Sequence, residues 1–200
     1  PFLSVRSLSH TYHTNSGETP ALRDIHFDLF PGEFAAIVGP SGCGKSTLLE
    51  LIAGLIPIET GSLLYPACNK TPAIGYMLQK DHLLEHRTIY KNIILGLEIQ
   101  HRLTEKNLEY VQKLMRQYGI ADFASSYPRE LSGGMRQRAA LIRTLALKPE
   151  FLLLDEPFSA LDYQTRLDVS DDIAKIIRQS GVTTLLVTHD LSEAISIADR

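Results

Sequence analysis

The sequence is poor in the residues that build disulfide frameworks, metal centres and membrane spans. It contains two cysteines, Cys43 and Cys68, whose spacing matches neither a disulfide framework nor a set of metal ligands. We expect both to be free thiols in a reducing compartment. No stretch reaches the roughly 18 to 20 apolar residues of a membrane span, because the best candidate, residues 47–58, contains a glutamate, a glycine and a proline. No signal peptide opens the sequence either, so a membrane role would depend on a partner.

An excess of positive charge is also lacking. Lysine and arginine number 20 against 23 aspartate and glutamate residues, which gives a formal net charge of −3. A chain without a basic field has no long-range attraction for nucleic acid, so we expect no nucleic-acid partner. The apolar share of 44% is ordinary for a globular protein, and 200 residues suffice for one domain or a domain with a small lobe.

Both ends of the sequence carry strand patterns. Residues 2–8 and 25–30 have strand length and are separated by a polar turn, which predicts an antiparallel β lobe at the N-terminus. Short apolar runs at 34–38, 151–154 and 182–188 read as buried strands, with helical patterns between them. This alternation favours an α/β fold with a mostly parallel, buried sheet.

The middle third has a helical character. Residues 104–119 place apolar side chains on one helical face, and a second helix is expected at about 135–147. We interpret residues 80–148, approximately, as a helical subdomain inserted into a core formed by residues 1–79 and 149–200.

A glycine-rich loop lies between the strand expected at 34–38 and the helix that follows. It matches the pattern G-x-x-x-x-G-K-[ST], in which backbone amides and a helix N-terminus surround phosphate oxygens. The lysine adds a full charge at the β- and γ-phosphates, and the hydroxyl after it ligates Mg²⁺. The pattern therefore predicts the core of a P-loop NTPase. The loop residues are Gly39, Pro40, Ser41, Gly42, Cys43, Gly44, Lys45, Ser46 and Thr47.

Two carboxylates end the apolar run at 151–154. Asp155 and Glu156 would lie at the carboxyl edge of a parallel sheet, where such sheets bind ligands. By itself an acidic pair here is most often a solvated strand end. Beside a phosphate loop, it predicts that Asp155 supports Mg²⁺ and that Glu156 polarises the water that attacks the γ-phosphate.

A third motif precedes the helix expected at 135–147. It reads Leu-Ser-Gly-Gly-Met-Arg-Gln from position 131, and Ser-Gly-Gly before a helix is also a plain capped N-terminus. Together with the other motifs, it resembles the signature sequence of the ATP-binding-cassette (ABC) family, with Met135 in the usual glutamine place. The resemblance implies nucleotide-binding roles for Ser132, Gly133, Gly134 and Gln137.

The order of the remaining motifs resembles the same family over nearly the whole sequence. Gln79 resembles the glutamine of the Q-loop, Ser159 to Asp162 the D-loop, and His189 the switch histidine. Tyr12 stands where the family has an aromatic residue that stacks on adenine. Each of these residues alone is more often structural, but their common order indicates one ABC ATPase domain.

The resemblance implies a head-to-tail homodimer that encloses ATP and Mg²⁺ at its interface. Each subunit would bring its phosphate loop to one nucleotide. Ser132, Gly133 and Gly134 of the facing subunit, here called the signature turn, would cap the γ-phosphate. Asp162 and Tyr12 would also contact the nucleotide. The residues expected to act in catalysis are Lys45, Gln79, Glu156 and His189. The residues expected to hold Mg²⁺ are Ser46, Gln79 and Asp155.

Two classes of ABC protein are compatible with this pattern: transporter ATPases and soluble cassettes of DNA repair, chromosome organisation or translation. The stretch between Lys45 and Leu131 is too short for the coiled coils or zinc modules of the repair type, and one cassette is present rather than two. The chain also lacks the Asn-Lys-x-Asp motif of GTPases. These features favour a transporter subunit at the cytoplasmic face of the membrane, bound peripherally to permease subunits.

Within transporters, the segment Gln79-Lys-Asp-His-Leu-Leu resembles importer cassettes of the nitrate, sulfonate and taurine type, a group that includes transporters of thiamine precursors. Such importers also use a solute-binding protein. Glu85 and His86 replace the Pro-Trp pair that often follows, at the place where we expect residues 80–95 to contact the permease. Because the sequence stops at Arg200, soon after His189, we expect the cassette to be incomplete at its C-terminus.

Overall fold

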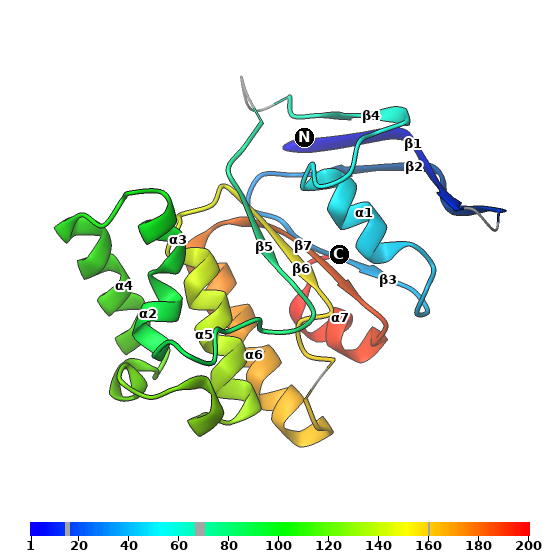
Figure 1. Cartoon of the computed structure of the whole chain (residues 1–200). Coiled ribbons are helices and arrows are strands. Elements are labelled where there is room, and N and C mark those ends of the chain that lie inside the picture. Colours follow the sequence, from blue (N-terminus) through cyan, green and yellow to red (C-terminus); the bar gives the residue numbers. More distant parts are fainter. Residues whose placement is uncertain (15–16, 67–70, 160) are drawn as a thin grey trace.

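The computed structural model describes residues 1–14, 17–66, 71–159 and 161–200 (Figure 1). Two β-sheets and a group of helices make up the described fold. Cys68 lies outside the described residues. Cys43 is an exposed free thiol, as predicted.

The N-terminal lobe is an antiparallel sheet with the order β2-β1-β4. Its strands are β1 (Leu3–Thr14), β2 (Gly17–Leu29) and β4 (Thr60–Leu64). The predicted antiparallel lobe is confirmed, but β1 and β2 are longer than their apolar segments. Backbone pairing, such as Tyr12 opposite Thr19, extends the hairpin through polar and exposed residues that carry no strand pattern.

The second sheet is entirely parallel and has the order β3-β7-β6-β5. Its strands are β3 (Phe34–Val38), β5 (Ile74–Met77), β6 (Phe151–Asp155) and β7 (Thr183–Thr188). Every residue of β6 and β7 is buried, because these central strands are covered on both faces. This confirms the strands predicted from continuous apolar runs, whereas β5 was not predicted.

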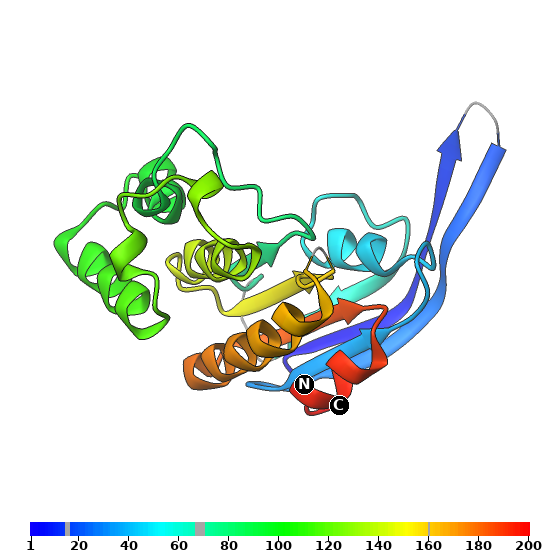
Figure 2. The same cartoon turned by 90° about the horizontal axis from the view of Figure 1, so that it is seen from below.

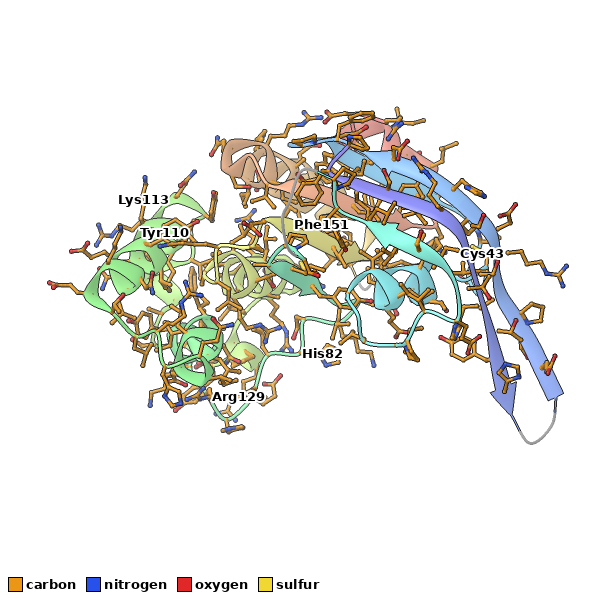
Figure 3. All side chains as sticks on the ribbon, turned by 90° about the horizontal axis from the view of Figure 1, so that it is seen from above. Cys43, His82, Tyr110, Lys113, Arg129 and Phe151 are labelled. Atoms are coloured by element: carbon orange, nitrogen blue, oxygen red, sulfur yellow. The ribbon has the colours of Figure 1, made fainter. Side chains whose placement is uncertain are left out.

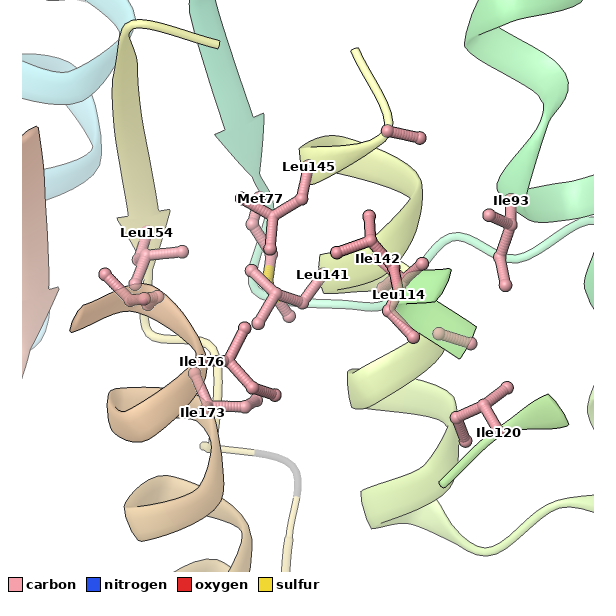
Figure 4. Close-up of a cluster of buried hydrophobic side chains, with 14 of the residues drawn as sticks. Met77, Ile93, Leu114, Ile120, Leu141, Ile142, Leu145, Leu154, Ile173 and Ile176 are labelled. Carbon is pink, nitrogen blue, oxygen red and sulfur yellow. The ribbon is translucent and has the colours of Figure 1, made fainter. Parts of the chain in front are cut away.

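The two faces of the parallel sheet pack against different layers. Helix α1 (Lys45–Ile52) lies between the two sheets, and it shares a core with Phe151 and Leu153 of β6 (Figure 1). Leu152 and Leu154, which point the other way, pack with the helices on the opposite face (Figure 4). Helices α6 (Tyr163–Ser180) and α7 (Leu191–Ile197) contribute to that second core.

The remaining helices follow β5 and precede β6 in the chain. They are α2 (Ile89–Ile93), α3 (Leu95–Ile99), α4 (Glu105–Gln117) and α5 (Gly133–Leu145), with short 3₁₀ turns at Ala121–Phe123 and Pro128–Glu130. Figure 2 shows α2 to α4 on one side of the molecule and the β1–β2 hairpin on the other. The helical character of this insertion is confirmed; its division from the core at residues 80 and 148 stays a prediction.

The ends of the two main helices of the insertion follow from local chemistry. The hydroxyl of Thr104 accepts a hydrogen bond from the Asn107 amide at 3.4 Å, and Gly119 ends the segment after α4 with φ of 68°. Helix α5 begins two residues earlier than the prediction of about 135, because Ser132 is its N-cap. Its hydroxyl accepts from the Met135 amide at 3.4 Å.

None of the helices in the described ranges is long and apolar enough to span a bilayer.

Truncating a buried and an exposed aliphatic side chain should change the free energy of unfolding by different amounts. Leu153 is fully buried in the central strand β6, whereas Ile195 is exposed on α7. Leu153→Ala should lower the free energy of unfolding by about 2–5 kcal/mol, since it leaves a cavity. Ile195→Ala should change it by less than about 0.5 kcal/mol. Urea denaturation measures both, and equal losses would contradict the layered core.

Candidate functional site

The phosphate loop connects β3 to α1, and its conformation requires glycine. Gly42 and Gly44 have φ of 79° and 96°, in the left-handed region that other residues avoid. A Cβ atom on Gly44 would also collide with the carbonyl oxygen of Ala21 and the side chain of Leu22. The loop therefore packs directly against the N-terminal lobe, and α1 begins at Lys45 with its amides directed into the loop.

The Lys45 ammonium is buried at the centre of the site. Its Nζ donates hydrogen bonds to the carbonyl oxygens of Gly39 at 2.8 Å and Pro40 at 2.9 Å. It also lies 3.3 Å from Oε1 of Glu156, whose carboxylate is mostly buried. Lys45 thus joins the two ends of the phosphate loop to the carboxylate that follows β6.

Asp155 lies on the other side of the loop. The Ser46 hydroxyl donates to its Oδ1 at 3.0 Å, and the Tyr76 hydroxyl donates to its Oδ2 at 3.2 Å. Burial, with a smaller contribution from the charge of Glu156, raises the pKa of Asp155 despite these hydrogen bonds. Burial and the neighbouring Asp155 likewise raise the pKa of Tyr76.

Glu156 has a strained backbone and contacts both a lysine and a histidine side chain. Its φ of 42° is unusual for a residue with a side chain, and such strain is concentrated at functional sites. The amide of Glu156 donates to the carbonyl of Val187 at 2.9 Å, which fixes the turn against β7. His189, after the end of β7, places Nδ1 3.1 Å from Oε2 of Glu156. One carboxylate thus contacts both Lys45 and His189.

Gln79 lies just after the end of β5 and lines the site. Its Nε2 donates to the Ser159 hydroxyl at 3.2 Å, and that hydroxyl donates to the carbonyl of Glu156 at 3.0 Å. Tyr12 approaches from the hairpin, with its hydroxyl 3.2 Å from Oγ1 of Thr47.

An open cavity of about 360 Å³ lies between the phosphate loop and the N-terminal hairpin. The predicted residues that line it are Tyr12, Gln79, Glu156 and six residues of the loop: Ser41, Gly42, Gly44, Lys45, Ser46 and Thr47. Gly39, Pro40, Cys43, Asp155 and His189 are not among its lining residues. The hairpin adds three residues that the sequence did not single out: Thr19, Pro20 and Ala21.

The predicted signature residues are also absent from the lining of this cavity. Ser132 to Gly134 form the N-terminus of α5, where a Cβ on Gly133 would meet Leu161 and one on Gly134 would meet Val169. Both glycines therefore allow α5 to approach the segment before α6 and α6 itself.

Two further predicted residues are engaged elsewhere. Gln137 is buried, with 3% of its surface exposed, and the Asp162 carboxylate caps α6 by accepting from the Thr165 amide at 3.1 Å. Their contacts with a nucleotide stay predictions.

Sequence reasoning missed Tyr76. Its only signal is position: β5 pairs with β6, and Tyr76 lies opposite Leu153, two residues before Asp155. Its hydroxyl reaches the carboxylate because neighbouring parallel strands end together. A pattern within one segment carries no such information.

The site suits a nucleotide better than a metal bound by protein alone. Among the described residues, no group of three or more His, Cys, Asp and Glu side chains could hold a metal ion. The Ser46 hydroxyl beside the Asp155 carboxylate is nevertheless the oxygen-rich, sparse donor set that Mg²⁺ uses when phosphates complete its coordination. The cavity, the loop amides and Lys45 supply the phosphate-binding part.

The fold and the loop define a phosphate-loop nucleotide-binding domain. The sequence model of the ABC transporter family matches residues 22–159. The chain belongs to this family and is its ATP-binding, ATP-hydrolysing domain. The family predicted from the motifs is thus confirmed.

Several relatives are similar over most of this chain. An uncharacterized ABC transporter ATP-binding protein, YtlC of Bacillus subtilis, is 48% identical over 99% of this chain and 77% of its own length. The aliphatic sulfonates import ATP-binding protein SsuB of Ralstonia nicotianae is 44% identical over 92% of this chain and 64% of its own length. The nitrate import ATP-binding protein NrtC of Synechococcus elongatus is 38% identical over the whole chain and 31% of its own length.

A solved structure confirms the fold class. The ATP-binding cassette MJ0796, in a dimeric post-hydrolysis state bound to ADP and Pi, superposes with a TM-score of 0.80. It is 28% identical to this chain, and the match covers 96% of this chain and 90% of that one.

Helix α7, which follows His189 in the chain, carries a buried carboxyl group, that of Glu193. Glu193 accepts a hydrogen bond from the Thr188 hydroxyl at 2.9 Å, while its other oxygen is buried without a hydrogen-bond partner. Thr188 also accepts from the Asp190 amide at 3.0 Å, and Asp190 caps α7. Burial raises the pKa of Glu193 to about 7.

This raised pKa predicts a pH-dependent stability. The contribution of Glu193 to folding is fully present below its ordinary pKa of 4.5 and is lost as the pH rises through about 7. The unfolding free energy of the parent, relative to Glu193→Gln, should therefore fall between pH 5 and pH 8. Urea denaturation across this range measures the difference. Glu109→Gln, at an exposed position on α4, is the control and should show no such trend. A constant difference for Glu193→Gln would refute the assignment.

Proposed function

We propose that this chain is the ATPase subunit of an ABC importer and that it works as a head-to-tail homodimer enclosing ATP. The main support for the proposal is that the predicted nucleotide-binding residues lie in two separate places on one chain. The phosphate loop, Glu156 and Gln79 line one cavity, whereas the signature turn of the same chain lies at the start of α5, outside that cavity. A second copy would supply a signature turn to the open side, and the similar MJ0796 cassette is dimeric.

The proposed chemistry uses the contacts of Lys45 and Glu156. Glu156 is paired with Lys45 and lies beside His189. The terminal phosphates of ATP would give Lys45 a different anionic partner, since phosphate oxygens bind between the loop amides and this ammonium. Glu156 would then be free to accept a proton from the attacking water, with His189 held next to it as a hydrogen-bonding group.

Mg²⁺ would be held by Ser46 and Asp155, with Gln79 nearby, and would neutralise charge on the phosphates. Tyr76 and Ser46 orient the Asp155 carboxylate, because each hydrogen-bonds a different oxygen of it. Tyr12 would contact the adenine from the hairpin side of the cavity, next to Thr47.

The transport part of the proposal rests on the relatives. Those described as nitrate, aliphatic sulfonate and sulfate/thiosulfate import proteins support an importer of a small solute, of the nitrate, sulfonate, taurine or thiamine-precursor type. We place the chain peripherally at the cytoplasmic face of the membrane, with residues 80–95 against permease subunits and a solute-binding protein on the far side. No observation favours the alternative of a soluble DNA-repair or translation ATPase.

Glu156→Gln tests the catalytic arrangement. The amide keeps the shape of the side chain but cannot accept the proton, so ATP binding should persist while turnover falls by at least about a hundredfold. ATP should then hold the variant as a dimer that size-exclusion chromatography with light scattering detects. Glu109→Gln, remote from the cavity on α4, should hydrolyse ATP like the parent. Unchanged turnover in Glu156→Gln would refute the role of Glu156, and an ATP-bound monomer would refute the dimer.

A further inference from the structure

The loop between β5 and α2 has an irregular backbone that other elements hold in place. Figure 3 shows His82 on this loop, where it crosses from the sheets to the helices. His82 has φ of 46°, an uncommon value for a residue with a side chain. The loop is not part of a sheet or helix, and besides its own hydrogen bonds, such as that from the Leu83 amide to Asp81, side chains of neighbouring elements bond to it.

One set of hydrogen bonds joins the loop to Asn92 of α2. Asn92 is completely buried, and its side chain accepts from the Leu84 amide at 2.7 Å. Its Nδ2 donates to the carbonyl oxygens of Leu84, Arg87 and Thr88, each at 3.1 Å. The second half of the loop is thereby fixed to the helical insertion.

A second set of ion pairs and hydrogen bonds joins the loop to two arginines on α5. Arg136 forms a two-pronged ion pair with Asp81, with Nε 2.9 Å from Oδ2 and Nη2 3.2 Å from Oδ1, and its Nη2 also lies 3.0 Å from Glu85. Arg143, two turns further along the same face, donates to the backbone carbonyls of Asp81 at 2.6 Å and His82 at 2.8 Å. The loop is thus held along the length of α5.

The ion pair is ordered and partly shielded from water. The side chains of Arg136 and Asp81 are 26% and 18% exposed. Burial opposes ionisation of Asp81, but the hydrogen bonds from Arg136 and from the Leu83 amide outweigh it and lower the pKa of the carboxyl. A forked guanidinium–carboxylate pair of this kind fixes orientation as well as distance.

Arg136 is also bonded to the signature turn, which comprises Ser132, Gly133 and Gly134. Its backbone amide donates to the carbonyl of Ser132 at 3.0 Å, in the first turn of α5. Gly133, in the same turn, packs against Leu161, so the turn has close neighbours on both sides. A displacement of Asp81 would therefore be transmitted through one side chain to the backbone amides of Ser132 to Gly134.

We infer that the Asp81–Arg136 ion pair is a positioning device that ties the signature turn to the loop 80–87, so that the position of this loop sets how well the turn caps the ATP of the facing subunit. The inference rests on the proposed function, in which residues 80–95 contact the permease and the signature turn completes the partner's site. Asp81 and Arg136 act through the turn and need not touch nucleotide.

The test uses the full chain in the Glu156→Gln background and compares Asp81→Asn, Arg136→Gln and the double variant. Each should raise the ATP concentration for half-maximal dimerisation about tenfold, because a shielded charge pair is broken. ATP affinity of the monomer, measured with a fluorescent ATP analogue, should stay within about twofold, because the phosphate loop is untouched. The double variant should be no worse than Arg136→Gln, since that change alone already removes the Asp81–Arg136 interaction, along with the contact to Glu85. Arg136→Lys keeps the positive charge but cannot form the two-pronged pair, so its ATP concentration for half-maximal dimerisation should lie between those of the parent and of Arg136→Gln.

Arg138→Gln is the matched control. Arg138 lies on the same helix, its side chain is also 26% exposed, and it pairs with Asp172 of α6 rather than with the loop. It should dimerise like the parent. Hydrogen exchange should show faster exchange in peptides covering 131–137 for Asp81→Asn but not for Arg138→Gln.

The outcomes separate the inference from the function on which it rests. Dimerisation of Asp81→Asn and Arg136→Gln at the parent's ATP concentration would overturn the inference alone, as would additive losses in the double variant. A parallel loss of monomer ATP affinity would reveal a general structural role and would overturn it too. Failure of the Glu156→Gln parent to dimerise with ATP would refute the proposed function, and the inference would fall with it.

Discussion

The ion pair between Lys45 and Glu156 is the contact on which the rest of the site depends. It brings a buried ammonium, held by the carbonyls at the start of the phosphate loop, to the carboxylate at the end of β6. A buried charge without a partner is costly, and each of these groups has one. Under the proposed function, a phosphate group of ATP would replace Glu156 as the partner of Lys45, and Glu156 would then be free to act in hydrolysis.

The parallel sheet explains why these groups meet. Strands β3, β6 and β7 lie side by side in the same direction, so their carboxyl ends place the phosphate loop, Asp155 with Glu156, and His189 at one edge. The strained backbone of Glu156 is held by the hydrogen bond from its amide to Val187. The helical insertion adds the signature turn at the start of α5, outside the cavity of its own chain.

The sequence was sufficient for features that local chemistry determines. The apolar runs of β6 and β7 marked buried parallel strands, and the glycine-rich pattern marked the phosphate loop between β3 and α1. It was insufficient where contacts join distant segments. Strand β5 is only four residues long and contains Gly75, whose added Cβ would strike Thr144 and Pro149, so its strand pattern is weak while its packing is tight.

The same limit applies to individual side chains. Tyr76 reaches Asp155, and Asp81 reaches Arg136, across 79 and 55 residues of sequence. No spacing rule connects such positions. Helix α5 begins at Gly133, two residues before the predicted start, because Ser132 is its N-cap. The permease contact, the dimer and the nucleotide and Mg²⁺ contacts of the predicted site residues stay predictions, because they concern groups outside this chain.

Calorimetric titration of the purified chain with ATP, with and without Mg²⁺, tests the central claim most directly when the parent is compared with Lys45→Ala. The account predicts magnesium-dependent binding by the parent and a loss of at least about tenfold in affinity for the variant, because a buried charge–phosphate contact is removed. Equal affinity of the two proteins for ATP would contradict it.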